Sequence, residues 1–311
     1  MKPVDPVRAL IAAFDRANLV ALGERHWARE DAEFCQRLVQ DRTFAEKVND
    51  IVIEFGNPLY QTALSRFVNG EEVPPSELRR VWQDTTQPGT WDSPVYEEFL
   101  VAVRAVNAKL PLRRRLRVLA GDYPINWSAV SGPGELPDLD ARDRSAADVI
   151  RREVLSRHRK ALVLFGSAHL YRNRPGTLVE LLKEDPRARW FVVVPVGGPG
   201  LPTGITANQG SSTRPVFIGL ADSGPGDLNA VDVLEREGRR IKVVDGKPAF
   251  VDGTPVFIPV FEAGIQVRQL VDALLFFGSA PPEFVQPPAS LYGATEYGRE
   301  TERRRKMVMP R

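Results

Sequence analysis

The sequence of 311 residues has little of two residue types that build many functional sites: it contains one cysteine, Cys35, and three histidines. A single cysteine excludes a disulfide framework and a cysteine-ligated zinc site. Cys35 falls within an amphipathic helical stretch, so we expect a buried structural thiol. Chemistry therefore has to come from carboxylates and from the few imidazoles.

An excess of one charge and long apolar runs are also absent. Lysine and arginine number 42 and aspartate and glutamate 40, a net charge of +2 that does not indicate a nucleic-acid or membrane partner. The short basic clusters Arg113–Arg115 and Arg303–Lys306 are typical of solvated surface. No run approaches the roughly 20 apolar residues of a membrane span, and the N-terminus lacks a secretory pattern. These features predict a cytoplasmic protein and leave its oligomeric state open.

Three common catalytic motifs are missing. The sequence has no Gly-x-x-x-x-Gly-Lys-Ser/Thr phosphate loop, and no Gly-x-Gly-x-x-Gly follows its first apolar run. It also has no Gly-x-Ser-x-Gly nucleophile elbow. Nucleotide-dependent chemistry and ordinary serine-hydrolase chemistry are therefore disfavoured.

Short apolar runs alternate with longer helical patterns, which predicts an α/β fold with a mostly parallel central sheet and helices on both faces. The expected strands are Leu19–Leu22, Asp50–Glu54, Leu116–Ala120, Ala161–Phe165, Trp190–Val196 and Pro215–Leu220. The expected helices between them are Ala28–Gln40, Leu59–Val68, Pro94–Lys109, Arg144–Arg159 and Gly176–Glu184.

We expect a single α/β domain at residues 1–278. The pattern of its C-terminal part predicts a hairpin-and-helix extension. A Gly- and Pro-rich stretch, 197–214, is expected to form a long loop that borders the site. Asp-Gly pairs predict a β-hairpin region at 241–260, and a helix is expected over Ile265–Phe277. The Pro-rich and basic tail, 279–311, is expected to wrap the surface.

Ionisable residues follow four consecutive predicted strands. Glu24 and His26 come after the first, Glu54 ends the second, Asp122 follows the third and His169 follows the fourth. In a parallel sheet the carboxyl ends of the strands share one edge, where ligands bind. We therefore expect these five side chains to converge on one crevice.

These residue types are compatible with two chemistries. An imidazole can transfer protons near neutral pH, and a carboxylate beside it can orient the ring. Alternatively, His26, Glu54 and His169 could bind a divalent metal and leave a position open for water. Simpler roles are an ion pair of Glu54 with Arg25 or Arg37, and a loop cap for Asp122.

The order of these motifs resembles a known superfamily. The segment LVALGERHWAREDAEFCQRL contains Gly-Glu-x-His followed by Glu33-Phe34 and Arg37, and it precedes Glu54 and the Gly-x-x-His motif that ends in His169. Over roughly residues 15–200 this pattern resembles the erythromycin esterase, ChaN-like and TraB/TIKI superfamily.

The resemblance implies a role for each matched residue. By analogy with the esterases, His26 would be the general base, Glu24 and Glu54 would support it, and His169 would polarise the substrate without a metal. The esterases carry an additional histidine where this chain has Gly166. The TIKI branch implies a metal-dependent peptidase. The ChaN-like branch implies haem binding, in proteins that are exported and lipid-anchored, whereas this chain shows no leader or anchoring cysteine near its start.

The leading hypothesis is a hydrolase that uses a His/Glu-activated water on an ester or amide of a small molecule or peptide. It requires no cofactor, and its expected substrate-binding residues are Arg25, Arg37, Trp27 and Tyr123. The alternatives are a protein that binds haem or another apolar ligand, and a metal-dependent peptidase. Turnover that depends on His26 favours the enzyme, and a haem spectrum favours the binding protein.

Overall fold

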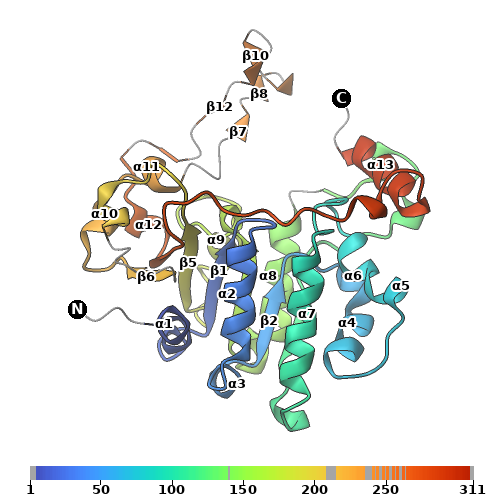
Figure 1. Ribbon diagram of the computed structural model, residues 1–311, viewed down its shortest axis with the longest axis horizontal. Coiled ribbons are helices and arrows are strands. Elements are labelled where there is room, and N and C mark those ends of the chain that lie inside the picture. The colour runs from blue at the N-terminus through green and yellow to red at the C-terminus, as the bar shows by residue number, and fades with distance from the viewer. Residues whose placement is uncertain are drawn as a thin grey trace.

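A seven-stranded sheet in the order β3-β2-β4-β1-β5-β13-β6 forms the centre of the fold (Figure 1). The computed structural model describes residues 5–138, 141–207, 215–234, 240–241, 243–244, 247–248, 250–251, 254–255, 257–258, 261–262 and 264–308. The strands of the sheet are β1 (Leu19–Glu24), β2 (Asp50–Ile53), β3 (Arg117–Ala120), β4 (Ala161–Gly166), β5 (Trp190–Val196), β6 (Val216–Gly219) and β13 (Ala273–Phe276).

All pairings in this sheet are parallel except that of β13 with β6. The chain passes from β1 to β2 and β3, returns to place β4 between β1 and β2, and then adds β5 on the other side of β1. The predicted α/β fold with a mostly parallel sheet is therefore confirmed. Its carboxyl edge carries the ends of β2, β4 and β1 next to one another.

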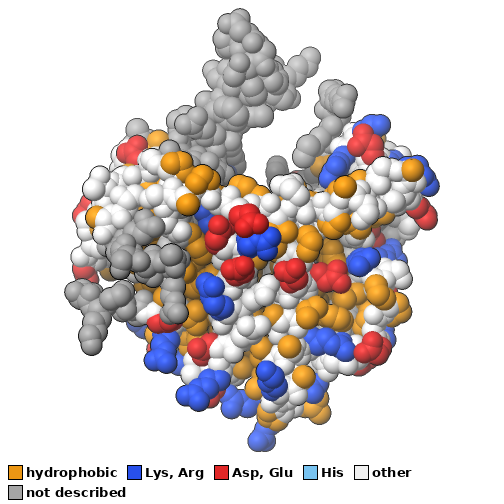
Figure 2. Space-filling model, viewed as in Figure 1, with side chains coloured by type: hydrophobic (Ala, Val, Ile, Leu, Met, Phe, Trp, Pro, Cys, Tyr) orange, Lys and Arg blue, Asp and Glu red, His pale blue; other side chains and the backbone are white. Residues whose placement is uncertain are grey.

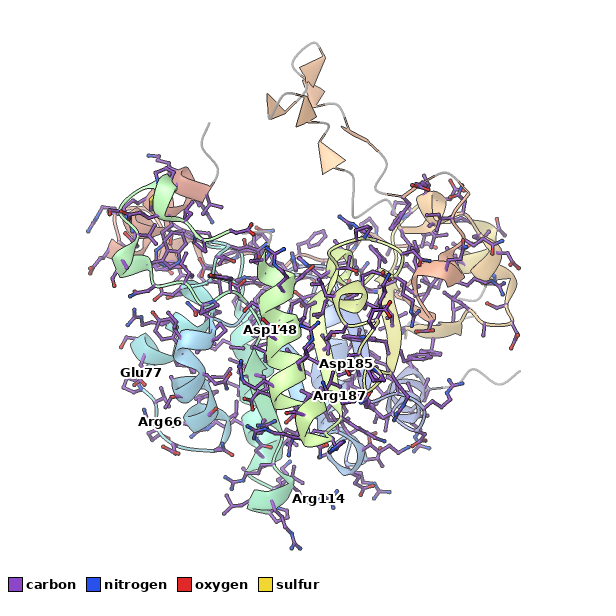
Figure 3. The ribbon with its side chains drawn as sticks, turned by 180° about the vertical axis from the view of Figure 1, so that it is seen from behind. Arg66, Glu77, Arg114, Asp148, Asp185 and Arg187 are labelled. Carbon is purple, nitrogen blue, oxygen red and sulfur yellow. The ribbon has the colours of Figure 1, made fainter. Side chains whose placement is uncertain are left out.

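Neighbouring residues on each strand enter different cores, as expected for strands buried on both faces. Val20 and Leu22 pack in the core under α1 (Pro6–Ala13), α2 (Arg29–Gln40) and α7 (Pro94–Asn107). Leu19 and Ala21 pack in the other core, under α8 (Arg142–Glu153). Figure 1 views the face with α2 and α7, and Figure 3 views the molecule from behind, with α8 in front.

Most of the remaining elements are short. The helices are α3 (Phe44–Lys47), α4 (Gln61–Val68), α5 (Pro75–Leu78), α6 (Arg80–Gln83), α9 (Leu178–Leu181), α10 (Thr203–Thr206), α11 (Ala230–Leu234), α12 (Val267–Leu270) and α13 (Glu296–Val308). In the predicted hairpin region, antiparallel pairs join β8 (Val243–Val244) to β9 (Lys247–Pro248), β10 (Phe250–Val251) to β11 (Thr254–Pro255), and β12 (Phe257–Ile258) to β7 (Arg240–Ile241).

The helix predicted over Ile265–Phe277 is wrong for most of its length. Only α12 is helical, and residues 273–276 form β13, which pairs with β5 and β6. A run of four apolar residues does not distinguish a buried helix from a buried strand. Leu274 and Leu275 are both buried but enter opposite cores, so β13 belongs to the central sheet and not to an extension.

After β13 the chain runs as an extended segment across the carboxyl edge of the sheet and ends in α13 (Figure 1). The solvated-surface interpretation of Arg303–Lys306 is wrong for Arg304, whose side chain is 9% exposed and forms an ion pair with Asp84. Cys35 is buried, as expected.

Charged side chains of both signs are interspersed over the face in Figure 2. On the opposite side (Figure 3), partly exposed ion pairs such as Arg66 with Glu77 and Arg187 with Asp185 contribute little to stability. No helix in the described ranges is long and apolar enough to cross a membrane.

Replacing Leu274 or Leu275 with alanine is expected to lower the free energy of unfolding by about 2–5 kcal/mol in each case, because both deletions leave a cavity in a close-packed core. Urea denaturation measures the loss. Leu112, which is 77% exposed, is the matched control, and its alanine variant is expected to change stability by less than about 0.5 kcal/mol. A large loss in only one of the two core variants would contradict a strand buried on both faces.

Candidate active site

The polar residues predicted at the strand ends follow four adjacent strands, and all of them except Asp122 follow β2, β4 or β1. Glu24 ends β1 and is in register with Gly166, which ends β4. Glu54 directly follows β2, and its backbone N–H donates to the carbonyl of Leu164 in β4. Because β4 lies between the other two strands, Glu24 and Glu54 flank Gly166 and the residues that follow it.

Glu24 and His26 form a hydrogen-bonded pair. Nδ1 of His26 lies 2.8 Å from Oε1 of Glu24, which also accepts a hydrogen bond from the hydroxyl of Tyr96 at 3.2 Å. Nε2 of His26 has no hydrogen-bond partner among the described residues, and the side chain is 35% exposed. With Glu24 on Nδ1, the neutral ring has its proton on Nδ1 and its free lone pair on Nε2.

The environment of His26 favours the imidazolium. Burial lowers the pKa of His26, but the hydrogen bond and charge of Glu24, together with the charge of Glu54, outweigh burial and raise the pKa above its ordinary value. Trp91, which is fully buried, packs its ring at 79° to the imidazole with 4.7 Å between centroids. The ring is therefore held by a carboxylate at one nitrogen and by an indole.

Gly166 leaves room for this imidazole. A Cβ atom at position 166 would lie 2.9 Å from Cε1 of His26, closer than side chains pack. A side chain at this position therefore does not fit beside His26 as it is placed in this chain. The backbone N–H of Gly166 donates to Oε2 of Glu54 at 2.7 Å.

Glu54 is fully buried and has three hydrogen-bonding partners. Besides Gly166, its Oε1 accepts from Arg142 at 2.7 Å and lies 3.3 Å from Nε2 of His169. Burial alone would raise the pKa of Glu54, but the positive charges of His169 and Arg142 hold it well below its usual range. The carboxylate is therefore ionised, and the partner suggested by the sequence, Arg25 or Arg37, is replaced by Arg142.

His169 lies between two carboxylates. Its Nδ1 is 2.6 Å from Oδ1 of Asp143, and its Nε2 faces Glu54. Burial lowers the pKa of His169, but the charge of Glu54 and the hydrogen bonds to Asp143 and Glu54 raise it to about 10. His169 is therefore a cation at neutral pH, whereas His26 has one nitrogen without a partner.

Sequence reasoning missed Arg142 and Asp143, the first two residues of α8. The guanidinium of Arg142 bridges Glu54 and Asp122, with Nε 2.9 Å from Oδ1 of Asp122. The signal that could have indicated it is the need of a buried Glu54 for a cation, but the sequence does not rank one arginine above another. Asp122 also accepts hydrogen bonds from the backbone and side chain of Thr86.

A pocket of about 560 Å³ opens above these groups, and it includes part of the predicted site. Glu24, His26 and His169 line it, whereas Glu54 and Asp122 lie outside its described lining and support it. The lining residues are Glu24, Arg25, His26, Gly166, Ser167, Ala168, His169, Tyr171, Gly197, Gly198, Pro199, Pro281, Pro282 and Phe284.

Of the four predicted substrate-binding residues, one is among the described residues that line the pocket. Arg25 lines the pocket, and its guanidinium is paired with Asp31. Trp27, Arg37 and Tyr123 are not among the described lining residues: the indole of Trp27 donates to the carbonyl of Thr90, and Arg37 lies over the ring of Phe34. The predicted loop contributes Gly197 to Pro199, and its residues 208–214 lie outside the described part of the chain.

The donor set does not fit a divalent metal. Of the three predicted ligands, Glu54 already contacts a guanidinium and His169 is protonated between two carboxylates, so a metal ion there would face two positive charges. Across the described ranges, no group of three or more His, Cys, Asp and Glu side chains is arranged to hold a metal ion.

Comparison by sequence and by structure gives different results. No protein-family model matches the sequence, and no curated protein matches it. A Bacillus cereus protein of known structure superposes with a TM-score of 0.56 at 12% identity, over 92% of this chain and 96% of its own. A succinoglycan biosynthesis protein gives a TM-score of 0.57 at 10% identity, over 91% and 95%.

A third structure is that of an esterase. Erythromycin esterase EreC, as a histidine-to-asparagine variant in its open conformation, superposes with a TM-score of 0.56 at 11% identity, over 89% of this chain and 94% of its own. At such low identity the likeness establishes the fold and no activity. The resemblance drawn from the motifs is thereby confirmed at the level of the fold: this chain has the fold of erythromycin esterase.

Proposed function

We propose that this protein is a hydrolase in which His26 activates a water molecule for attack on the carbonyl of an ester or amide in a small molecule or peptide. The observation that carries the proposal is the Glu24–His26 pair, whose unpartnered Nε2 belongs to a side chain that lines the pocket. A base oriented by a carboxylate, with its second nitrogen available to solvent, is the arrangement that water activation requires.

The two histidines would have different roles in the reaction. Neutral His26 accepts a proton from water as the oxygen bonds to the carbonyl carbon, and Glu24 stabilises the imidazolium that forms. The cationic His169 stabilises the oxyanion, and its Nε2 contact of 3.3 Å with Glu54 is long enough to be shared with a substrate oxygen. His26 then returns the proton to the leaving alcohol or amine as the tetrahedral intermediate collapses.

The pocket walls favour a substrate with an uncharged apolar group next to the reacting carbonyl. Tyr171 and Pro199 form part of the wall, and Pro281, Pro282 and Phe284 from the C-terminal segment form another part. Phe284 is 48% exposed although backbone hydrogen bonds on both sides of it hold its segment, so a ligand can bury its ring. An esterase of the same fold supports the choice of an ester.

A second candidate is a binding protein for haem or another apolar ligand. The same walls and the unpartnered Nε2 of His26 favour it, because that nitrogen could serve as an axial haem ligand. Haem titration followed by absorbance distinguishes the two. A Soret shift that is lost in His26→Ala, together with no ester turnover, would replace the hydrolase proposal.

His26→Ala is expected to lower kcat by at least ~10²-fold with p-nitrophenyl esters of short fatty acids, because positioned acid–base groups contribute about 10²–10⁴. Initial rates at 405 nm and circular dichroism would be measured on the same preparation. The matched control is His158→Asn, which removes an exposed histidine from the opposite edge of the sheet and keeps a residue suited to its φ of 53°. Unchanged turnover in folded His26→Ala would contradict the proposal.

The pH profile of kcat/KM is expected to be bell-shaped. His26 must be neutral to act as a base, so activity rises with pH through its pKa, which lies above the ordinary 6.5. His169 must be charged, so activity falls as pH passes its pKa of about 10. Glu24→Gln removes the charge that raises the pKa of His26, so the acid limb should move to lower pH. An acid limb that does not move would show that another group is the base.

A further inference from the structure

One segment of the chain, residues 84–93, lies between the C-terminal helix α13 and the candidate active site. Asp84, Pro88 and Asp92 contact residues of the C-terminal part, while Thr86, Gln87 and Trp91 contact residues of the site. The C-terminal part does not itself reach His26 or Arg142 through any polar contact of the described chain. It does contact the neighbouring Trp27, whose carbonyl accepts a hydrogen bond from the backbone N–H of Val285 at 2.8 Å. Residues 84–93 are therefore the connection that reaches the side chains of His26 and Arg142.

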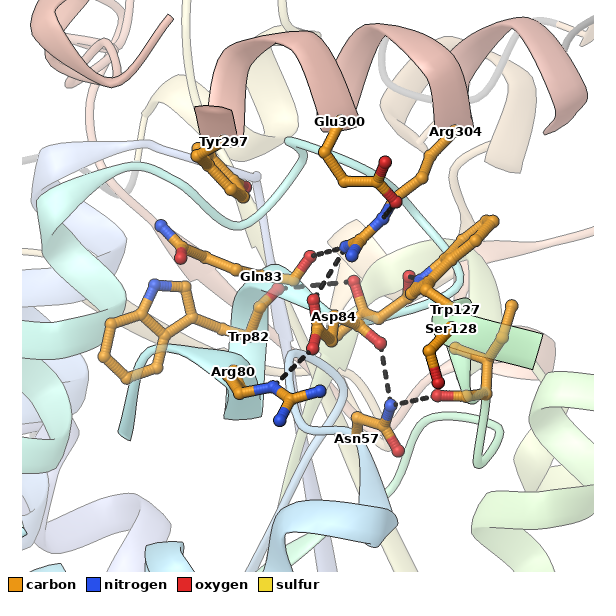
Figure 4. A network of polar contacts seen from close by, with 12 residues as sticks. Asn57, Arg80, Trp82, Gln83, Asp84, Trp127, Ser128, Tyr297, Glu300 and Arg304 are labelled. Atoms are coloured by element: carbon orange, nitrogen blue, oxygen red, sulfur yellow. Dashed lines mark hydrogen bonds and ion pairs between the residues drawn. The ribbon is translucent and has the colours of Figure 1, made fainter. Parts of the chain in front are cut away.

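On the side of α13, the connection begins with a buried ion pair (Figure 4). Nη1 of Arg304 lies 2.7 Å from Oδ1 of Asp84, and the guanidinium stacks over the ring of Trp127 at 5.1 Å. Asp84 also accepts hydrogen bonds from Arg80 and Tyr60. Breaking a buried pair of this kind leaves an uncompensated charge, so this contact holds α13 firmly in place.

A second buried carboxylate, Asp92, links the other end of residues 84–93 to the C-terminal part. Asp92 is 4% exposed and accepts hydrogen bonds from the hydroxyls of Tyr292, at 2.6 Å, and Tyr297, at 2.8 Å. Burial and the charge of Asp92 raise the pKa of both tyrosines, so both remain donors. Between these ties, Arg305 of α13 donates to the carbonyl of Pro88 at 3.0 Å.

On the side of the active site, residues 84–93 contact the Asp122–Arg142 pair and, separately, His26. Thr86 donates to Asp122, and Gln87 accepts from Arg142 at 3.1 Å, so the arginine that pairs with Glu54 is held from this segment. Trp91, next in sequence to Asp92, packs on the imidazole of His26. Its buried indole N–H has no hydrogen-bond partner among the residues that the structure describes, so its position depends on packing and on the chain on either side.

We propose that Tyr292 and α13 position His26 and Arg142 through residues 84–93, with Tyr292 and Tyr297 acting as positioning residues through Asp92 and Trp91. The expected effect on turnover rests on the proposed function, whereas the expected effect on the titration of His26 does not. Displacement of α13 would then lower the rate of the chemical step and leave the pocket walls, and hence substrate binding, largely intact.

The test is the double variant Tyr292→Phe/Tyr297→Phe, which removes both hydrogen bonds to Asp92 and retains the rings. We expect kcat to fall at least ~10-fold with KM within ~2-fold, because a small displacement of an acid–base group slows chemistry more than binding. Independently of turnover, NMR titration of the imidazole nitrogens should show a higher pKa for His26. When Trp91 packs less tightly, water reaches the imidazole of His26 and the ring is less buried. The pKa then rises, because burial is the largest influence that lowers the pKa of His26.

The matched control is Glu302→Gln/Lys306→Ala on the same helix, an exposed pair that makes none of the contacts with residues 84–93 described above. It should leave both kcat and the His26 titration unchanged. Should the double variant fail to fold, Tyr297→Phe alone keeps the Tyr292 bond and should show smaller changes in the same directions. A folded tyrosine variant with a wild-type His26 titration would overturn the inference. Absence of ester turnover in the wild type and in every variant, with a shifted His26 titration in the tyrosine variant, would refute the proposed function alone.

Discussion

The buried carboxylate of Glu54 is the constraint on which the site depends. An ionised group with no exposure to water requires compensating donors, and they come from β4 through Gly166, from α8 through Arg142 and from the loop after β4 through His169. One charge thus fixes the position of a helix N-terminus relative to the sheet and sets the protonation of a histidine. The remaining polar groups, Asp122 and Asp143, balance the cations that Glu54 requires.

The two histidines of the site differ in protonation because their neighbours differ. His169 has a carboxylate at each nitrogen and is a stable cation, whereas His26 has one carboxylate and one nitrogen left for a ligand. Pairs of titratable groups whose surroundings separate their pKa values are typical of acid–base catalysis. Gly166 adds a steric condition, because the space that a side chain would fill there is occupied by the His26 ring.

Local signals in the sequence predicted the parallel sheet and the strand ends at Glu24, Glu54 and His169, because a glycine or an ionisable residue directly after an apolar run is visible without knowledge of the fold. Partners distant in sequence could not be predicted in this way. Arg142 is 88 residues from Glu54, and Arg304 is 220 residues from Asp84, and in a chain rich in arginine no local feature selects either one. For β13, a short apolar run was compatible with two structures, and only pairing with β5 decides between them.

The position of β13 has a consequence for the synthesis of the protein. Its neighbour β5 ends at Val196, yet the edge of β5 is not covered until residues 273–276 have been made, some 77 residues later (273 minus 196). During translation the nascent sheet therefore has an open, apolar edge next to β1, the kind of surface that pairs with other chains. A chain cut short before β13 would keep that edge, so completion of the sheet, and with it protection from aggregation, waits until β13 has been made.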